Sequence, residues 1–185
     1  MTHLRRLVLL LTALGLASFA APALAAAPKG DCLWKTLPQT RKTELLDSYR
    51  AKGLESLQEI QVDDALTLKL RQACNFSADE DYAAGEILGA ILVERGAELM
   101  LSERNQIAMG AMDRVWRGLA PADRDAMTAF GLAVMANKND GAEAAAAIIV
   151  RVSADLGLPT TQMNTDVFAY LIARAIREAR EKGIT

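Results

Sequence analysis

Hydrophobic residues recur along most of the chain at intervals of three and four positions, the spacing of one face of an α-helix. Long runs of β-branched residues, which would favour strands, are absent. The pattern therefore predicts an all-α fold, a compact bundle of six to seven helices. Proline, glycine and capping residues delimit the expected segments, which are 38–52, 64–74, 78–101, 103–118, 121–136, 141–157 and 165–182. The third and fourth segments could also form one kinked helix.

Polar residues with capping chemistry precede three of these segments. Asp63 stands where its carboxylate would accept a hydrogen bond from the first turn of the second segment. Ser77 and Glu80, three positions apart, have the spacing of a capping box at the start of the third. Asp140 and Glu143 repeat that spacing before the sixth. We therefore expect all three helices to begin at these residues.

Two glycines lie on one face of the third segment. Gly85 and Gly89 are four positions apart, so they are neighbours on a helix and leave its backbone bare. The alanine-rich stretch 142–147 is the expected neighbour, because small residues on both helices allow close approach. The glycines are thus predicted to be structural packing positions.

The chain also contains a short sequence motif that occurs twice. Trp34 and Trp116 each begin the pattern Trp, Lys or Arg, any residue, Leu, and each pattern is followed by a proline and a helical segment. The offset indicates two diverged three-helix units, 34–101 and 116–182, within one domain. Alternatively, the pattern is a common way to begin a helix. Duplication would give a pseudo-symmetric bundle with a groove between its halves, and the two tryptophans would be equivalent core anchors.

The first 25 residues have the composition of a secretory signal peptide. Arg5 and Arg6 precede an uncharged apolar run over 7–21, and Ala23 and Ala25 supply the small residues of a cleavage site. We therefore expect a mature domain over 26–185 without a membrane anchor. The abundance of Ala and Arg is typical of a GC-rich bacterium, which makes the location periplasmic or secreted.

Two cysteines remain after the signal peptide, Cys32 and Cys74. An exported protein folds in an oxidising compartment, so we expect them to form a structural disulfide. A reactive thiol or a metal pair is the alternative, but the Cys-x-x-Cys spacing typical of such sites is missing.

Composition excludes several functional classes. The single histidine, His3, lies in the signal peptide, so the mature chain lacks imidazole for a Ser-His-Asp triad, a zinc site or a haem ligand. Removal of Arg5 and Arg6 leaves 19 basic against 23 acidic residues, a net charge of about −4 without a basic cluster. We therefore expect no nucleic acid partner, no metal and no cofactor.

Two carboxylates are weak catalytic candidates. Glu86 lies in an apolar stretch, where burial would raise its pKa and suit it to general acid catalysis. The Glu55-Ser56 dipeptide is similar to the Glu-Ser pair of lytic transglycosylases, which are helical envelope enzymes. The Gly-Leu-Met-Gln sequence that follows in that family is missing, so its activity is not transferred.

Without a catalytic constellation, the sequence favours a non-enzymatic binding or adaptor module of the bacterial envelope, with another envelope protein as partner. Two alternatives remain. The first is a carboxylate-dependent hydrolase that acts on envelope polymers through Glu86 or Glu55. The second is a protein that binds a small amphiphile or lipid in a groove between helices.

Overall fold

The computed structural model describes residues 29–60, 62–160 and 163–183. The predicted signal peptide over 1–25 lies outside these residues. The all-α class is confirmed, since the described residues contain helices and no strand. They form the α-helices α1 (Gly30–Thr36), α2 (Gln39–Lys52), α3 (Asp64–Cys74), α4 (Asp81–Asn105), α5 (Ala111–Gly118), α6 (Pro121–Met135), α7 (Ala142–Asp155) and α8 (Thr165–Glu181), and the 3₁₀ helices η1 (Gly53–Glu59) and η2 (Ala78–Glu80).

Two of the three predicted caps are confirmed. The Asp63 carboxylate accepts a hydrogen bond from the Leu66 backbone N–H at 2.7 Å. The Ser77 backbone N–H donates to the Glu80 carboxylate at 2.7 Å, and the chain enters α4 through η2. The third cap is wrong, because Gly141 occupies the N-cap of α7 with φ of 82° and no side chain caps that helix. Glycine adopts this left-handed conformation without the steric penalty of a Cβ atom.

Helix number and boundaries differ from the prediction in two places. The described residues contain eight α-helices, because the short α1 precedes the first predicted helix. The expected boundary between 101 and 103 is also wrong: α4 continues to Asn105, and α5 begins at Ala111. Gln106 and Gly110 both have positive φ, so the chain turns sharply between two separate helices.

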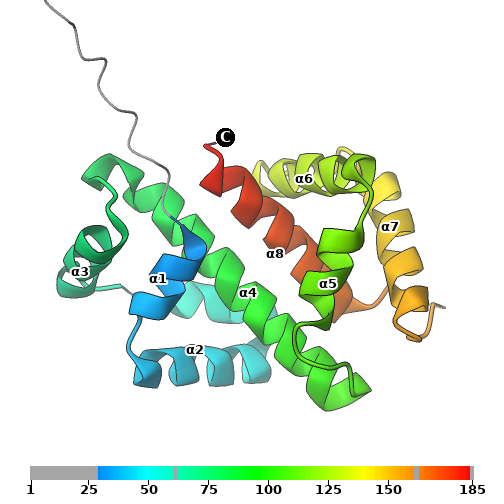
Figure 1. Ribbon diagram of the computed structural model, residues 1–185, viewed down its shortest axis with the longest axis horizontal. Coiled ribbons are helices and arrows are strands. Elements are labelled where there is room, and N and C mark those ends of the chain that lie inside the picture. The colour runs from blue at the N-terminus through cyan, green and yellow to red at the C-terminus, as the bar shows by residue number, and fades with distance from the viewer. Residues whose placement is uncertain (1–28, 61, 161–162, 184–185) are drawn as a thin grey trace, which may run out of the picture.

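An antiparallel pair of helices forms the centre of the molecule. Figure 1 shows α4 and α8 side by side and running in opposite directions, with α1, α2 and α3 on one side and α5, α6 and α7 on the other. Ion pairs from Glu86 to Arg180 and from Arg104 to Asp166 mark the two ends of this pair. No helix in the described part of the chain is long and apolar enough to span a bilayer.

The order of elements repeats once along the chain, as a short, a long, a medium and a second long helix. The junction between the first two helices has nearly the same backbone in both halves, with φ and ψ of −59° and 139° at Leu37 and −61° and 142° at Leu119. Each half of the described chain thus contains four α-helices, and the duplication itself stays a prediction. The tryptophans differ: Trp116 is buried and donates to Glu178 at 2.8 Å, whereas Trp34 is only partly buried.

The third helices of the two units are placed differently. α7 packs against α6 and α8, whereas α3 packs chiefly against α1. The predicted disulfide is confirmed, and it joins Cys32 in α1 to Cys74 at the end of α3. The bridge therefore holds α3 beside α1, where it covers α4 less than α7 covers α8.

Candidate functional site

An open groove of about 660 Å³ follows the α4–α8 pair. Its walls come from both halves of the chain, with η1 on one side and the end of α6 on the other. The groove-lining residues include Leu54, Leu57, Asp81, Tyr82, Gly85, Glu86, Gly89, Val134, Met135, Phe168 and Ile172. Most of them are apolar, and the volume falls within the range of about 300–1,000 Å³ that is typical of small-molecule sites.

Gly85 and Gly89 of α4 form part of the groove floor and do not pack against the alanine-rich helix α7. A Cβ atom at Gly85 would have no neighbour within 4 Å, and one at Gly89 would meet only Leu57, at 3.7 Å. The predicted close approach of the alanine-rich helix is therefore wrong. Glycine inside a helix is about 0.5–1 kcal/mol less stable than alanine. Because Gly85 has an ordinary helical φ and open space above it, the fold itself does not require glycine there.

Large hydrophobic side chains surround the opening of the groove. In the described part of the chain eight large hydrophobic residues are exposed, and four of them line this groove: Leu54, Tyr82, Val134 and Met135. Tyr82 is 77% exposed and Leu54 is 50% exposed. Single exposed hydrophobic residues are common on soluble proteins, but a contiguous group beside a groove is typical of a binding surface.

Charged groups are confined to one end of the groove. Glu86 is paired with Arg180, whose Nε lies 2.7 Å from Oε2 and whose Nη2 donates to Oε1 at 3.2 Å. Asp81 is bound by Arg71, whose guanidinium lowers the pKa of this carboxyl below its ordinary value. These residues lie at the start of α4, which is beside the end of α8 in the antiparallel pair.

The opposite end of the groove is apolar. Phe168, near the start of α8, packs edge to face against Phe130 with ring centroids 6.4 Å apart. Ile172, one turn further along α8, continues this apolar surface. The groove thus has one charged end and one apolar end, an arrangement that suits a ligand with a polar head and an apolar tail.

The catalytic candidates do not form a constellation. Both oxygens of Glu86 are engaged by Arg180, which is the arrangement of a structural ion pair. Glu55 is exposed on η1 and is not among the residues that line the groove. Ser56 beside it is buried and donates to the Gly53 carbonyl at 2.7 Å. Glu86 and Glu55 therefore do not form a pair of carboxylates that faces one substrate.

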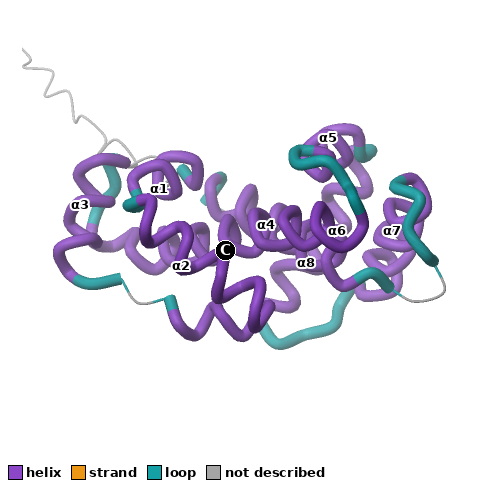
Figure 2. The backbone as a smooth tube through the Cα atoms, turned by 90° about the horizontal axis from the view of Figure 1, so that it is seen from below, coloured by secondary structure: helices purple, strands orange, loops and turns teal. Residues whose placement is uncertain are grey.

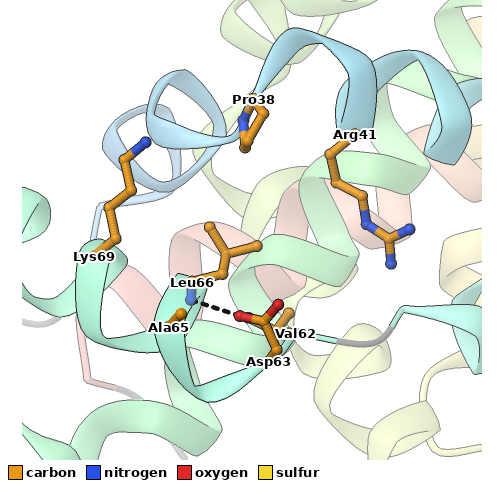
Figure 3. Close-up of a pocket in the computed structure, with 7 residues that line it drawn as sticks. All are labelled: Pro38, Arg41, Val62, Asp63, Ala65, Leu66 and Lys69. Atoms are coloured by element: carbon orange, nitrogen blue, oxygen red, sulfur yellow. Dashed lines mark hydrogen bonds between the residues drawn. The ribbon is translucent and has the colours of Figure 1, made fainter.

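A second hollow, of about 720 Å³, lies between the start of α2 and α3 (Figure 3). Lys69 and Arg41 stand on opposite sides of it, with Leu66 and Pro38 between them. Asp63, the carboxylate residue that lines this hollow, already caps α3. Most of its lining residues are exposed, so a ligand there would stay largely in water, and the hollow is a less suitable site than the groove.

The exposed residues around the groove were not predicted from the sequence. Each occupies an ordinary position on its own element, and only the fold brings η1, α4 and the end of α6 together. The repeated tryptophan motif was the only sequence signal for the groove, because a duplicated chain was expected to have a groove between its halves. Comparisons with protein families, curated proteins and solved structures found no match to this chain.

Proposed function

We propose that this chain is an exported, non-enzymatic binding protein that holds a single-chain amphiphile in the groove between its halves. The observation that carries the proposal is an open apolar groove with charged groups at only one end. The tail would lie along Phe168 and Ile172, and the head would lie near Glu86 and Asp81. The bare backbone at Gly85 leaves room for the chain against the groove floor.

The hydrophobic effect provides enough free energy for such binding. Each methylene removed from water contributes about 0.8 kcal/mol, so ten buried methylenes contribute about 8 kcal/mol. Part of this gain offsets the loss of translational and rotational freedom on association. Micromolar affinity for a medium-length acyl chain is the expected outcome.

Export to the periplasm is part of the proposal. The Cys32–Cys74 disulfide supports it, because structural disulfides persist in oxidising compartments and are rare in the cytosol. The composition of residues 1–25 gives independent support, since it has the charge and hydrophobicity of a signal peptide.

A second candidate function is the capture of a helix from another envelope protein. The spacing of Gly85 and Gly89 favours it, because small residues four apart on an open helix face allow another backbone to come close. Such a partner would place apolar anchors on Leu54 and Met135. The carboxylate-dependent hydrolase has no comparable support from the geometry.

We test the proposal with two ligands, dodecanoate and dodecylphosphocholine. Their binding is measured by native mass spectrometry and by displacement of a fluorescent probe. Gly85→Leu places a side chain in the groove, and we expect it to weaken acyl-chain binding at least ten-fold. Gly118→Leu is the matched control, since Gly118 is also a helical glycine with no neighbour within 4 Å and lies outside the groove.

Equal binding by the two variants, or no saturable binding by the unmodified protein, would overturn the amphiphile proposal. If Gly85→Leu instead abolishes crosslinking to one envelope protein while acyl chains never bind, the second candidate replaces it. Both variants should remain folded, because leucine has a higher helix propensity than glycine.

A further inference from the structure

A small polar cavity lies on the opposite side of the α4–α8 pair from the groove. Its volume is about 280 Å³. On α8 it is lined by Tyr170, Arg174 and Arg177, which alternate with the groove residues Phe168 and Ile172 around the helix. Figure 2 shows α1 and α5 together on one side of the central pair. The cavity lies on that side, bounded by the beginnings of both helices.

Two of the carboxylates at this cavity are already neutralised. Glu94 accepts from Arg177 Nε at 2.5 Å and from Arg177 Nη2 at 3.1 Å. Asp113 lies 3.3 Å from Arg174 and 2.5 Å from Arg117. Each carboxylate therefore has a guanidinium within direct ion-pair distance.

Glu98 lacks such a close partner. Its side chain is only 5% exposed, and its Oε1 accepts one hydrogen bond, from the Gly110 backbone N–H at 3.0 Å. Its cationic neighbour on α4 is Arg95, whose Nη1 lies 3.9 Å from Oε2, too far for a hydrogen bond. Burial raises the pKa of Glu98, as expected for a carboxyl group removed from water without a full counter-ion.

Tyr170 provides the second unpartnered group. The residue is only 2% exposed and lines the cavity, and its hydroxyl makes no hydrogen bond to any residue that the structure describes. The Tyr170 oxygen is not one of the fully buried polar atoms without a partner in the described residues, so it is accessible from the cavity. Burial, followed by the charges of Glu94 and Glu98, raises the pKa of Tyr170, so these carboxylates lie within electrostatic range of the hydroxyl.

We propose that this cavity binds a small organic cation whose primary ammonium group is held by the Glu98 carboxylate and the Tyr170 hydroxyl. An ammonium group has three N–H donors and no acceptor, which suits a carboxylate oxygen and a hydroxyl oxygen that no donor occupies. It would also be a closer counter-ion for Glu98 than Arg95, whose Nη1 lies 3.9 Å away. A metal ion suits the site less well, because no three acidic or cysteine side chains in the described residues are grouped to ligate one.

Isothermal titration calorimetry with n-butylammonium tests the inference on the folded protein with its disulfide intact. Butanol and butanoate, which have the same chain length and no positive charge, are the comparison ligands. We expect saturable binding of n-butylammonium alone, weakened at least ten-fold by Glu98→Gln and at least three-fold by Tyr170→Phe. Glu44→Gln, at an exposed surface carboxylate, should bind like the unmodified protein.

Absence of saturable binding, or equal binding by Glu98→Gln and the unmodified protein, would overturn the inference. Circular dichroism at the titration temperature establishes that each variant is folded, and the amide oxygen introduced by Glu98→Gln can still accept from the Gly110 N–H. The inference is independent of the amphiphile proposal, since Gly85→Leu fills only the groove and should leave n-butylammonium binding unchanged.

Discussion

The buried ion pair between Glu94 and Arg177 joins the two halves of the molecule, and its removal should destabilise the fold strongly. Arg177 donates two hydrogen bonds to the Glu94 carboxylate, at 2.5 and 3.1 Å, and the side chains are 9% and 7% exposed. Replacing one member of a buried pair destabilises a protein by about 3–5 kcal/mol, because the remaining charge stays buried. Glu94→Gln keeps one acceptor oxygen, so we expect a loss of about 3 kcal/mol, at the lower end of that range.

Urea denaturation followed by circular dichroism measures this loss. With a slope of about 1–3 kcal/mol per molar urea, the midpoint should fall by about 1–3 M. Glu44→Gln is the matched control, because Glu44 also pairs with an arginine, Arg41 at 3.1 Å, but its side chain is 64% exposed. Exposed pairs contribute about 0–1 kcal/mol, so this control should change little.

A loss below about 1 kcal/mol for Glu94→Gln would refute the reasoning, since Glu181, which already accepts from Arg177 Nη1 at 3.1 Å, would then be a sufficient partner for the remaining guanidinium. The double variant Glu94→Met and Arg177→Met provides an independent check. It removes both charges and fills similar volume, so it should recover most of the lost stability. If the double variant is less stable than Glu94→Gln, packing and not the unpaired charge explains the loss.

Three further predictions concern stability. The paired substitution Cys32→Ser and Cys74→Ser should reduce the free energy of unfolding by about 4 kcal/mol, from the entropy of closing the loop between the cysteines; an unchanged urea midpoint would contradict this. Burial raises the pKa of Glu98 in the folded state only, so the contribution of Glu98 to native stability should fall as pH rises from about 4 towards 7. Glu98→Gln should therefore gain stability relative to the unmodified protein over that range, and a pH-independent difference in urea denaturation would count against it. Gly96→Ala should destabilise by about 1–3 kcal/mol because the new methyl group would overlap the Tyr49 ring, whereas Gly118→Ala should not destabilise; equal melting temperatures would rule this out.

The features that the sequence predicted well are local. Asp63 caps a helix within three residues of itself, and the Ser77–Glu80 pair does the same. The disulfide was predictable from the number of cysteines and the expected compartment, without knowledge of the fold. Where the local prediction failed, at Asp140, a glycine one residue later adopted a conformation that no side-chain pattern indicates.

The roles of the glycines could not be predicted, because they depend on distant partners. Gly85 and Gly89 have the spacing of a packing motif, yet a Cβ atom at Gly85 would face open space and one at Gly89 would meet only Leu57, at 3.7 Å. The glycine of α4 that allows close packing is Gly96, whose neighbour Tyr49 is far away in the sequence on α2. Spacing along one helix shows which residues share a face, but only the fold decides what that face meets.

The groove follows from a difference between the two halves. α7 packs on α6 and α8, whereas its counterpart α3 is bound to α1 by the disulfide and packs chiefly there. The start of α4 consequently stays open, and Tyr82 and Gly85 are exposed where a third helix would otherwise cover them. The disulfide thus holds α3 on α1, and α3 reaches the groove only through Arg71, which binds Asp81 at its charged end.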